Sequence, residues 1–221
     1  AGDVFKFDNC GPISENGGTG VCIGAAINGS KPILVHQRMD FSLYAADQLI
    51  NNAAKWFSMF GGQRSVPLVV RMIIGRGWGQ GNQHSQNLTA LYAHVPGLKI
   101  VMPSNARDAK VLFVDAVRDP NPVLFIEHRW LYDTTSEVPE EFPPDPARPL
   151  AIYPGSDVTI VASGHAFREA FKAREFLKDQ VSIELIDLHT IRPFPTASIR
   201  ESVRRTGRLV VVDDAWRFGG L

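Results

Sequence analysis

Short apolar runs alternate with segments of helical periodicity along most of this chain, and this alternation limits its fold more than any other feature. In the first half, strands are predicted at Lys31–His36, Pro67–Ile74, Leu98–Met102 and Pro122–Glu127. Helices are predicted at about 19–27, 43–60, 86–94 and 105–118, with Ser104 as the N-cap of the last one. The order strand, helix, strand indicates an α/β fold.

The predicted strands are apolar over nearly their whole length, as at Val66–Val70 and Val123–Ile126. Strands of this kind are typical of parallel sheets that helices cover on both faces. The fold class is therefore predicted to be α/β, with a doubly wound, mostly parallel sheet and a second, smaller α/β domain.

A proline-rich and acidic stretch divides the chain, with Pro139, Pro143, Pro144, Pro146 and Pro149 among few apolar residues. We predict a first domain at residues 1–135, a linker at 136–154 and a second domain at 155–221. Strands at 157–163, 181–188 and 208–213 alternate there with helices at 166–178 and 197–206. The chain ends after a strand, where a parallel sheet should continue, so the second domain is predicted to be truncated.

Charge and apolar content narrow the classes of function. The 23 basic and 23 acidic residues cancel, which disfavours a nucleic-acid partner or an anionic membrane surface. No apolar run reaches the about 20 residues of a membrane helix, and no signal pattern is seen, which predicts a cytoplasmic protein, or one of the mitochondrial matrix or plastid in a eukaryote. Cys10 and Cys22 are predicted to be free thiols because their number and spacing suit neither a disulfide framework nor a metal site.

Glu15 is the first candidate for chemistry. It follows Ser14 at the start of a small-residue helix, where a carboxylate would face the cleft in which open α/β sheets bind ligands. The alternative is a solvated acid that favours the helix dipole after a Ser14 cap.

A glycine at every second position from Gly75 to Gly81 marks a second candidate region, which leads directly to His84. No Gly-Lys-Ser/Thr ending or dinucleotide fingerprint is present, so a phosphate cradle is disfavoured. We interpret the segment as a loop that places His84 at the mouth of a site, where His84 is either structural or catalytic. Phe41 is either a core residue or an aromatic platform. The other histidines are predicted to be structural, since none has metal-site spacing.

The order of several sequence blocks resembles the β subunits of thiamine-diphosphate-dependent 2-oxo acid dehydrogenases, the first component (E1) of pyruvate-dehydrogenase-type complexes. These blocks are Pro12-Ile13-Ser14-Glu15, Asp40-Phe41, Asn52-Ala53-Ala54-Lys55, Gln83-His84-Ser85-Gln86, His94-Val95-Pro96-Gly97-Leu98-Lys99, Asp108-Ala109-Lys110, Arg118-Asp119-Pro120-Asn121-Pro122-Val123 and Thr190-Ile191-Arg192-Pro193. The resemblance covers almost the whole chain. It implies a transketolase-like pyrimidine-binding domain followed by a transketolase C-terminal domain.

The resemblance also implies roles for the three candidates. The residue matching Glu15 bonds a ring nitrogen of the thiamine aminopyrimidine and promotes ionisation of the thiazolium carbon. Phe41 matches the aromatic residue on which the pyrimidine packs. His84 matches the histidine that handles the substrate or the acyl group passing to lipoamide.

Metals and partners are implied in the same way. A potassium site would use Leu68, Ala116, Val117, Asp119 and Asn121. The chain has no Gly-Asp-Gly segment of the kind that binds magnesium and the diphosphate in this class, so Mg²⁺ is expected to be held mainly by an α subunit. The resemblance implies an α2β2 assembly, a lipoyl-bearing E2 partner and a 2-oxo acid substrate.

Two segments depart from the family pattern, Val35-His36-Gln37-Arg38 and Arg71-Met72-Ile73-Ile74-Gly75-Arg76. They leave the identity of the 2-oxo acid and of the acceptor open. A transketolase-like or carboligating enzyme without a redox acceptor, and a non-catalytic interaction subunit, remain as alternatives.

Overall fold

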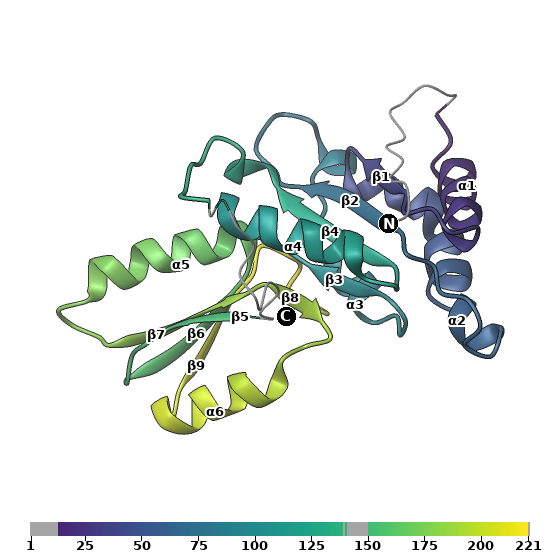
Figure 1. The fold of residues 1–221 in the computed structure, drawn as a ribbon. Coiled ribbons are helices and arrows are strands. Elements are labelled where there is room, and N and C mark those ends of the chain that lie inside the picture. The colour runs from purple at the N-terminus through teal and green to yellow at the C-terminus, as the bar shows by residue number, and fades with distance from the viewer. Residues whose placement is uncertain (1–12, 139, 141–149, 221) are drawn as a thin grey trace.

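The structure, a computed structural model, describes residues 13–138, 140 and 150–220 and contains two α/β domains (Figure 1). The first domain has a five-stranded sheet in the order β1-β2-β4-β3-β8, and the second has a four-stranded sheet in the order β5-β7-β6-β9. The predicted fold class is confirmed. Among the described residues, no helix is both long and apolar enough to cross a membrane.

Parallel pairing dominates the first sheet, as the apolar strands predicted. Its strands are β1 (Ile33–His36), β2 (Val69–Ile74), β4 (Val123–His128), β3 (Lys99–Val101) and β8 (Thr190–Arg192). The pairs β1/β2, β2/β4 and β3/β4 are parallel, whereas β8 pairs antiparallel with β3. Because β8 comes from the second half of the chain, the two domains share this sheet.

The first domain contains eight helical segments among its described residues. They are α1 (Glu15–Ile27), η1 (Met39–Ala45), η2 (Gln48–Ala53), α2 (Trp56–Met59), η3 (Asn82–His84), α3 (Thr89–Ala93), α4 (Ala106–Arg118) and η4 (Arg129–Leu131). On one face of the sheet, α4 packs Leu112 and Ala116 against Val123 and Phe125. On the other face, Cys22 and Ile23 of α1 pack in the main core. Helices therefore cover both faces.

The segment predicted as one helix at 43–60 is mostly helical, but it is not a single α-helix. The chain forms a 3₁₀ helix, a π-helical segment and one short α-helix there instead. Two buried polar residues in η1 have distant partners: Asp40 accepts two hydrogen bonds from Gln86, and Ser42 pairs with Tyr92. These contacts fix the backbone in a way that apolar spacing does not encode.

The prediction that Ser104 caps α4 is also wrong. The N-cap is Asn105, whose side-chain oxygen accepts a hydrogen bond from the Asp108 backbone nitrogen at 2.9 Å. The Ser104 hydroxyl instead donates to Asp187 of the second domain. Ser104 therefore forms an interdomain hydrogen bond and does not cap the helix, although the local sequence favoured it as the cap.

The second sheet lies between two helices, α5 (Gly164–Leu177) and α6 (Thr196–Thr206) (Figure 1). Its strands are β5 (Leu150–Tyr153), β6 (Val158–Ala162), β7 (Ile183–Leu188) and β9 (Leu209–Val212). β5 falls inside the segment predicted as a linker, and the linker's prolines 139, 143, 144, 146 and 149 lie outside the described residues. The main core is continuous across both domains, since Leu124 of β4 and Ile186 of β7 belong to it.

Cys22 is a free, buried thiol, and burial raises its pKa to about 11. The prediction of a free Cys22 is confirmed, whereas Cys10 lies outside the described residues.

Replacing Tyr92 with phenylalanine is expected to lower the free energy of unfolding by about 1 kcal/mol. The Ser42 hydroxyl donates to the Met39 carbonyl at 2.6 Å, so the Tyr92 hydroxyl, at 2.7 Å, donates to Ser42 in a fully buried place. The measurement is the midpoint of urea unfolding, with Tyr44→Phe, an exposed tyrosine, as the control. An unchanged midpoint in Tyr92→Phe would show that this bond adds nothing.

Candidate functional site

The carboxyl ends of β1, β2 and β4 lie at one edge of the first sheet, because these strands are parallel. The segments that follow them are residues 37–41, the glycine-rich loop 75–81 and η4. In an open α/β sheet this edge is where ligands bind. All three predicted candidates, Glu15, Phe41 and His84, lie on segments next to this edge.

Glu15 is the first residue of α1 and is half-buried. Ser14 caps the helix by accepting a hydrogen bond from the Gly17 nitrogen at 3.2 Å, so the capping interpretation holds for Ser14. The charge of Glu15 acts on His36, at the end of β1. Burial lowers the pKa of His36 to about 4, although the Glu15 charge opposes this shift, so His36 is neutral near pH 7.

The rings of Phe41 and His84 contact each other edge to face, with their centroids 5.1 Å apart and their planes at 80°. His84 lies in η3, where its backbone nitrogen donates to the Gly81 carbonyl at 3.3 Å. A hollow of about 410 Å³ flanks it and is lined by Asn82, Gln83, Ser85, Gln86 and Trp216. Phe41 is therefore neither a core residue nor isolated, because it faces the candidate histidine.

The glycine-rich loop adopts a conformation that other residues rarely take. Gly75 and Gly81 have φ values of +124° and +74°, and Gly77 and Gly79 are also positive. Trp130 fixes the loop by donating its indole N–H to the Arg76 carbonyl at 2.9 Å. Its ring also packs against that of Trp78, with the ring centroids 4.7 Å apart. The positive φ values account for the alternating glycines, so a phosphate-binding role is not needed to explain them.

Three buried side-chain nitrogens at this edge have no hydrogen-bond partner among the described residues: His36 Nε2, Arg38 Nη1 and His84 Nδ1. A buried polar atom without a partner costs about 1–3 kcal/mol, and native proteins rarely leave such atoms in a group. The edge therefore has the character of a site whose ligand supplies the missing partners. The Phe41 ring and the Glu15 carboxylate at the helix start fit a heteroaromatic cofactor, and the three nitrogens fit polar groups of a ligand bound next to it. His36 and Arg38 were missed as site residues, and their departure from the family pattern was the signal.

The atoms expected to bind potassium are engaged by the protein itself. The Lys31 ammonium bonds the Val117 carbonyl at 2.8 Å, and Lys99 bonds the Asp119 carboxylate at 2.9 Å. The second Asp119 oxygen accepts from Asn121, and the Leu68 carbonyl accepts from the Val123 nitrogen. Ala116 is buried in α4. Two ammonium groups, of Lys31 and Lys99, therefore already bond part of the predicted potassium ligand set.

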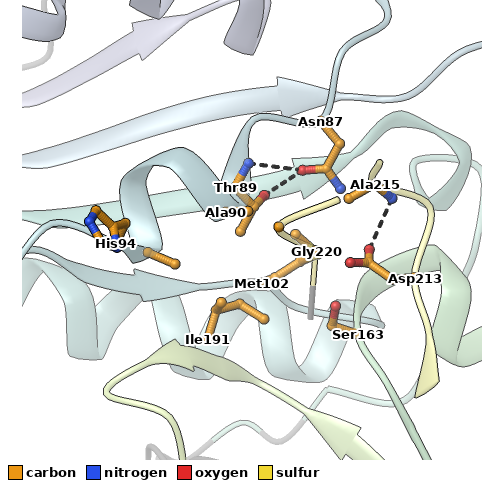
Figure 2. A pocket seen from close by; sticks show the side chains of 12 residues that line it. Asn87, Thr89, Ala90, His94, Met102, Ser163, Ile191, Asp213, Ala215 and Gly220 are labelled. Atoms are coloured by element: carbon orange, nitrogen blue, oxygen red, sulfur yellow. Dashed lines mark hydrogen bonds between the residues drawn. The ribbon is translucent and has the colours of Figure 1, made fainter. Parts of the chain in front are cut away.

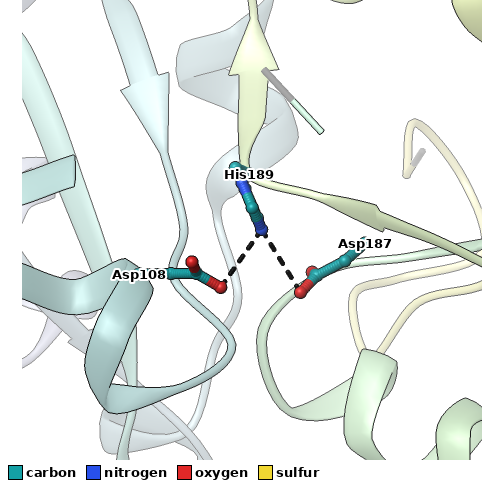
Figure 3. A group of neighbouring side chains, drawn as sticks. All are labelled: Asp108, Asp187 and His189. Atoms are coloured by element: carbon teal, nitrogen blue, oxygen red, sulfur yellow. Dashed lines mark ion pairs between the residues drawn. The ribbon is translucent and has the colours of Figure 1, made fainter. Parts of the chain in front are cut away.

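A second polar cluster, which we call the interdomain cluster, consists of Asp108, Asp187 and His189 (Figure 3). His189 Nε2 lies 3.2 Å from Asp108 and 3.3 Å from Asp187. Burial opposes protonation of His189, but the two carboxylates raise its pKa to about 10, and His189 in turn lowers the pKa of Asp108. The cluster joins Asp108 of α4 in the first domain to Asp187 of β7 and to His189, which lies between β7 and β8.

His189 is predicted to be structural because it lacks metal-site spacing, and the sequence analysis does not identify its two carboxylate partners. The available signal was Asp187-x-His189, since residues two apart on an extended segment point to the same side. Asp108 could not be found in this way because it is remote in sequence.

A smaller cavity of about 220 Å³ lies between α3 and the last described segment (Figure 2). Met102, Ile191 and Ala93 supply apolar walls, while Asn87 and Asp213 supply polar ones. The Asn87 side chain is already engaged, because it accepts from Thr89 and donates to Asp214 at 2.8 Å. Glu15, Phe41 and His84 do not line this cavity.

Comparisons with protein families match both domains. The family described as "Transketolase, pyrimidine binding domain" matches residues 6–135, and "Transketolase, C-terminal domain" matches residues 150–221.

Comparisons with curated proteins give relatives of two kinds. The pyruvate dehydrogenase E1 component subunit beta of Rickettsia felis is 43% identical over 95% of this chain and 65% of its own length. The acetoin:2,6-dichlorophenolindophenol oxidoreductase subunit beta of Cupriavidus necator is 43% identical over 92% of this chain and 61% of its own length. The chain thus spans about two thirds of the length of these relatives.

A similar solved structure is a "Split gene transketolase, inactive beta4 tetramer", with a TM-score of 0.76. It is 24% identical over 95% of this chain and 66% of that one, and it supports the fold alone.

Proposed function

Because the chain belongs to the transketolase family through its pyrimidine-binding and C-terminal domains, we propose that it is a β subunit of a thiamine-diphosphate-dependent 2-oxo acid dehydrogenase. The proposed reaction is the oxidative decarboxylation of a pyruvate-type 2-oxo acid with acyl transfer to lipoamide. The observation that carries the proposal is the meeting of Phe41 and His84 beside three unpartnered buried nitrogens at the edge where Glu15 begins α1.

We propose a separate role for each residue at the carboxyl edge of the first sheet. Phe41 offers a ring face for the aminopyrimidine of the cofactor, and Glu15 holds and returns a proton at a pyrimidine nitrogen. Neutral His36 beside Glu15 leaves that carboxylate without a full counter-charge. His84 is half-buried next to the hollow and can bond the substrate or the acyl acceptor. Thiamine diphosphate, when bound, supplies the electron sink for the decarboxylation.

An α subunit is the partner that the proposal requires. In the sequence no Gly-Asp-Gly segment is available to hold Mg²⁺ and the diphosphate, so the α subunit would provide that half of the site. We propose an α2β2 assembly of E1 that passes the acyl group to a lipoyl-bearing E2.

A second candidate function is oxidation of acetoin, a neutral substrate. It is favoured by the Cupriavidus necator relative, which is as similar to this chain as the Rickettsia felis protein, at 43% identity each. A carboligating or transketolase-like reaction without a redox acceptor would use the same residues.

The test combines the protein with its α subunit, thiamine diphosphate and Mg²⁺ and follows reduction of an artificial dye with a panel of 2-oxo acids and acetoin. We expect dye reduction that depends on a 2-oxo acid. Reduction with acetoin alone would select the second candidate, and ketol formation without dye reduction would select the carboligating reaction. No turnover with any substrate would contradict the proposal.

Replacing His84 with alanine is expected to lower acyl transfer to lipoamide about 10²-fold, because the ring that bonds the reacting group is lost. The measurement compares lipoamide acylation with dye reduction in the same preparation. His94→Ala, which removes an exposed histidine of the same domain, is the control. Unchanged acylation in His84→Ala would remove His84 from the proposed site.

A further inference from the structure

Arg38 is a buried arginine whose guanidinium is only partly engaged. The residue is 5% exposed and follows the end of β1, just before η1. Its Nη2 donates to the side-chain oxygen of Gln80, in the glycine-rich loop, whereas Nη1 is buried without a partner. A buried charged donor without an acceptor is costly, so its retention needs a physical reason.

The charges around Arg38 do not neutralise it. Burial and repulsion from Arg129 lower the pKa of Arg38. Both effects are larger than the opposing attraction of Asp40. Asp40 itself accepts two hydrogen bonds from Gln86 through one oxygen, at 3.2 and 2.9 Å. Glu127, a carboxylate of β4, is paired with Arg71 at 2.6 Å. Among the described residues, no ion pair joins Arg38 to a carboxylate.

Arg38 is also connected directly to the candidate site. Its carbonyl accepts a hydrogen bond from the backbone nitrogen of Phe41 at 3.2 Å, and Phe41 contacts the His84 ring. Gln80 lies two residues before η3, the helix that contains His84. An anion bound to Arg38 would therefore lie next to the residues proposed to bind the cofactor and the substrate.

We propose that Arg38 binds an anionic group, a carboxylate or a phosphate, that the substrate carries in addition to the carboxylate lost as carbon dioxide. The inference rests on the proposed function and deepens it by naming a substrate class. A guanidinium that bound the departing carboxylate would stabilise the substrate more than the transition state, in which that charge disperses, and would slow the reaction. A group that keeps its charge gives binding energy in both states. Gln80 then acts as the partner of Arg38 while the site is empty of substrate.

The kinetic test compares four substrates in the assembled enzyme: pyruvate, 2-oxoglutarate, 4-phosphono-2-oxobutyrate and acetoin. We expect Arg38→Gln to lower kcat/KM about 30-fold, mainly through KM, for whichever of the two substrates with an additional anionic group is turned over. For pyruvate and acetoin the loss should stay below about 3-fold, since neither offers that group. Arg38→Lys should recover part of the loss. Arg205→Gln removes an arginine paired with Glu184 in the second domain and should show no substrate dependence.

A binding test separates this inference from the proposed function. Trp78 lies against Arg129 at 4.9 Å, so its fluorescence should respond when glutarate or inorganic phosphate binds nearby. Binding that is lost in Arg38→Gln and kept in Arg205→Gln supports the inference even if no substrate is turned over. Equal kinetic losses for all substrates, a loss for pyruvate as large as for 2-oxoglutarate, or no anion binding by the unmodified protein would overturn it. If Arg38→Gln does not fold, the same substrate ratios in Arg38→Lys decide the outcome.

Discussion

Turnover of the assembled enzyme is expected to fall about 10³-fold when Glu15 is replaced by glutamine, with the fold unchanged. Glutamine keeps the size and polarity of the side chain at the start of α1 but cannot hold and return a proton. Neither the Ser14 cap nor the packing of Cys22 and Ile23 depends on the carboxylate, so α1 should remain intact. The measurement is dye reduction with saturating substrate, together with calorimetric titration of thiamine diphosphate into the α/β assembly.

Glu201→Gln is a suitable control for this experiment, because it removes an exposed carboxylate from α6 in the second domain. It should leave turnover unchanged. Activity of Glu15→Gln within about threefold of the unmodified enzyme would contradict the proposed role of Glu15. A large loss of activity that came with a lowered unfolding temperature would assign Glu15 to stability instead.

His189→Ala is expected to lower the free energy of unfolding by about 3–5 kcal/mol at pH 7. The substitution removes the only cation of the interdomain cluster and leaves the half-buried Asp108 carboxylate next to the buried Asp187 carboxylate. It also removes a link between the two domains (Figure 3).

The stabilisation by His189 should depend on pH in a defined direction. Its pKa is raised from 6.5 to about 10 in the folded protein, so the stabilisation is fully present below pH 6.5 and is lost as the pH rises towards 10. Urea unfolding at pH 6, 8 and 10 measures this, with His94→Gln as an exposed-histidine control. The difference between the unmodified protein and His189→Ala should shrink over this range. A difference that is the same at all three pH values would show that the histidine is not held as a cation.

The sequence by itself determined the α/β class, most strands and the candidates Glu15, Phe41 and His84. Apolar runs and helical spacing report the burial of each residue within its own segment, so they predict β2 or β4 well. The ordered blocks of the family resemblance then selected three polar or aromatic residues out of many. Their roles stay predictions until the variants are measured.

Only the tertiary structure decided the features that join distant segments. Tyr92 and Gln86 bond Ser42 and Asp40 in η1, the 3₁₀ helix that begins before the helix predicted at 43–60. Ser104 donates a hydrogen bond to Asp187 of the second domain instead of capping α4. β8 pairs with β3 across the domain boundary. Whether a buried nitrogen such as Arg38 Nη1 has a partner likewise depends on side chains remote in the chain. Hydrogen bonds and ion pairs of this kind form by proximity in space, and the periodicity of a single segment holds no information about which distant side chain will lie opposite it.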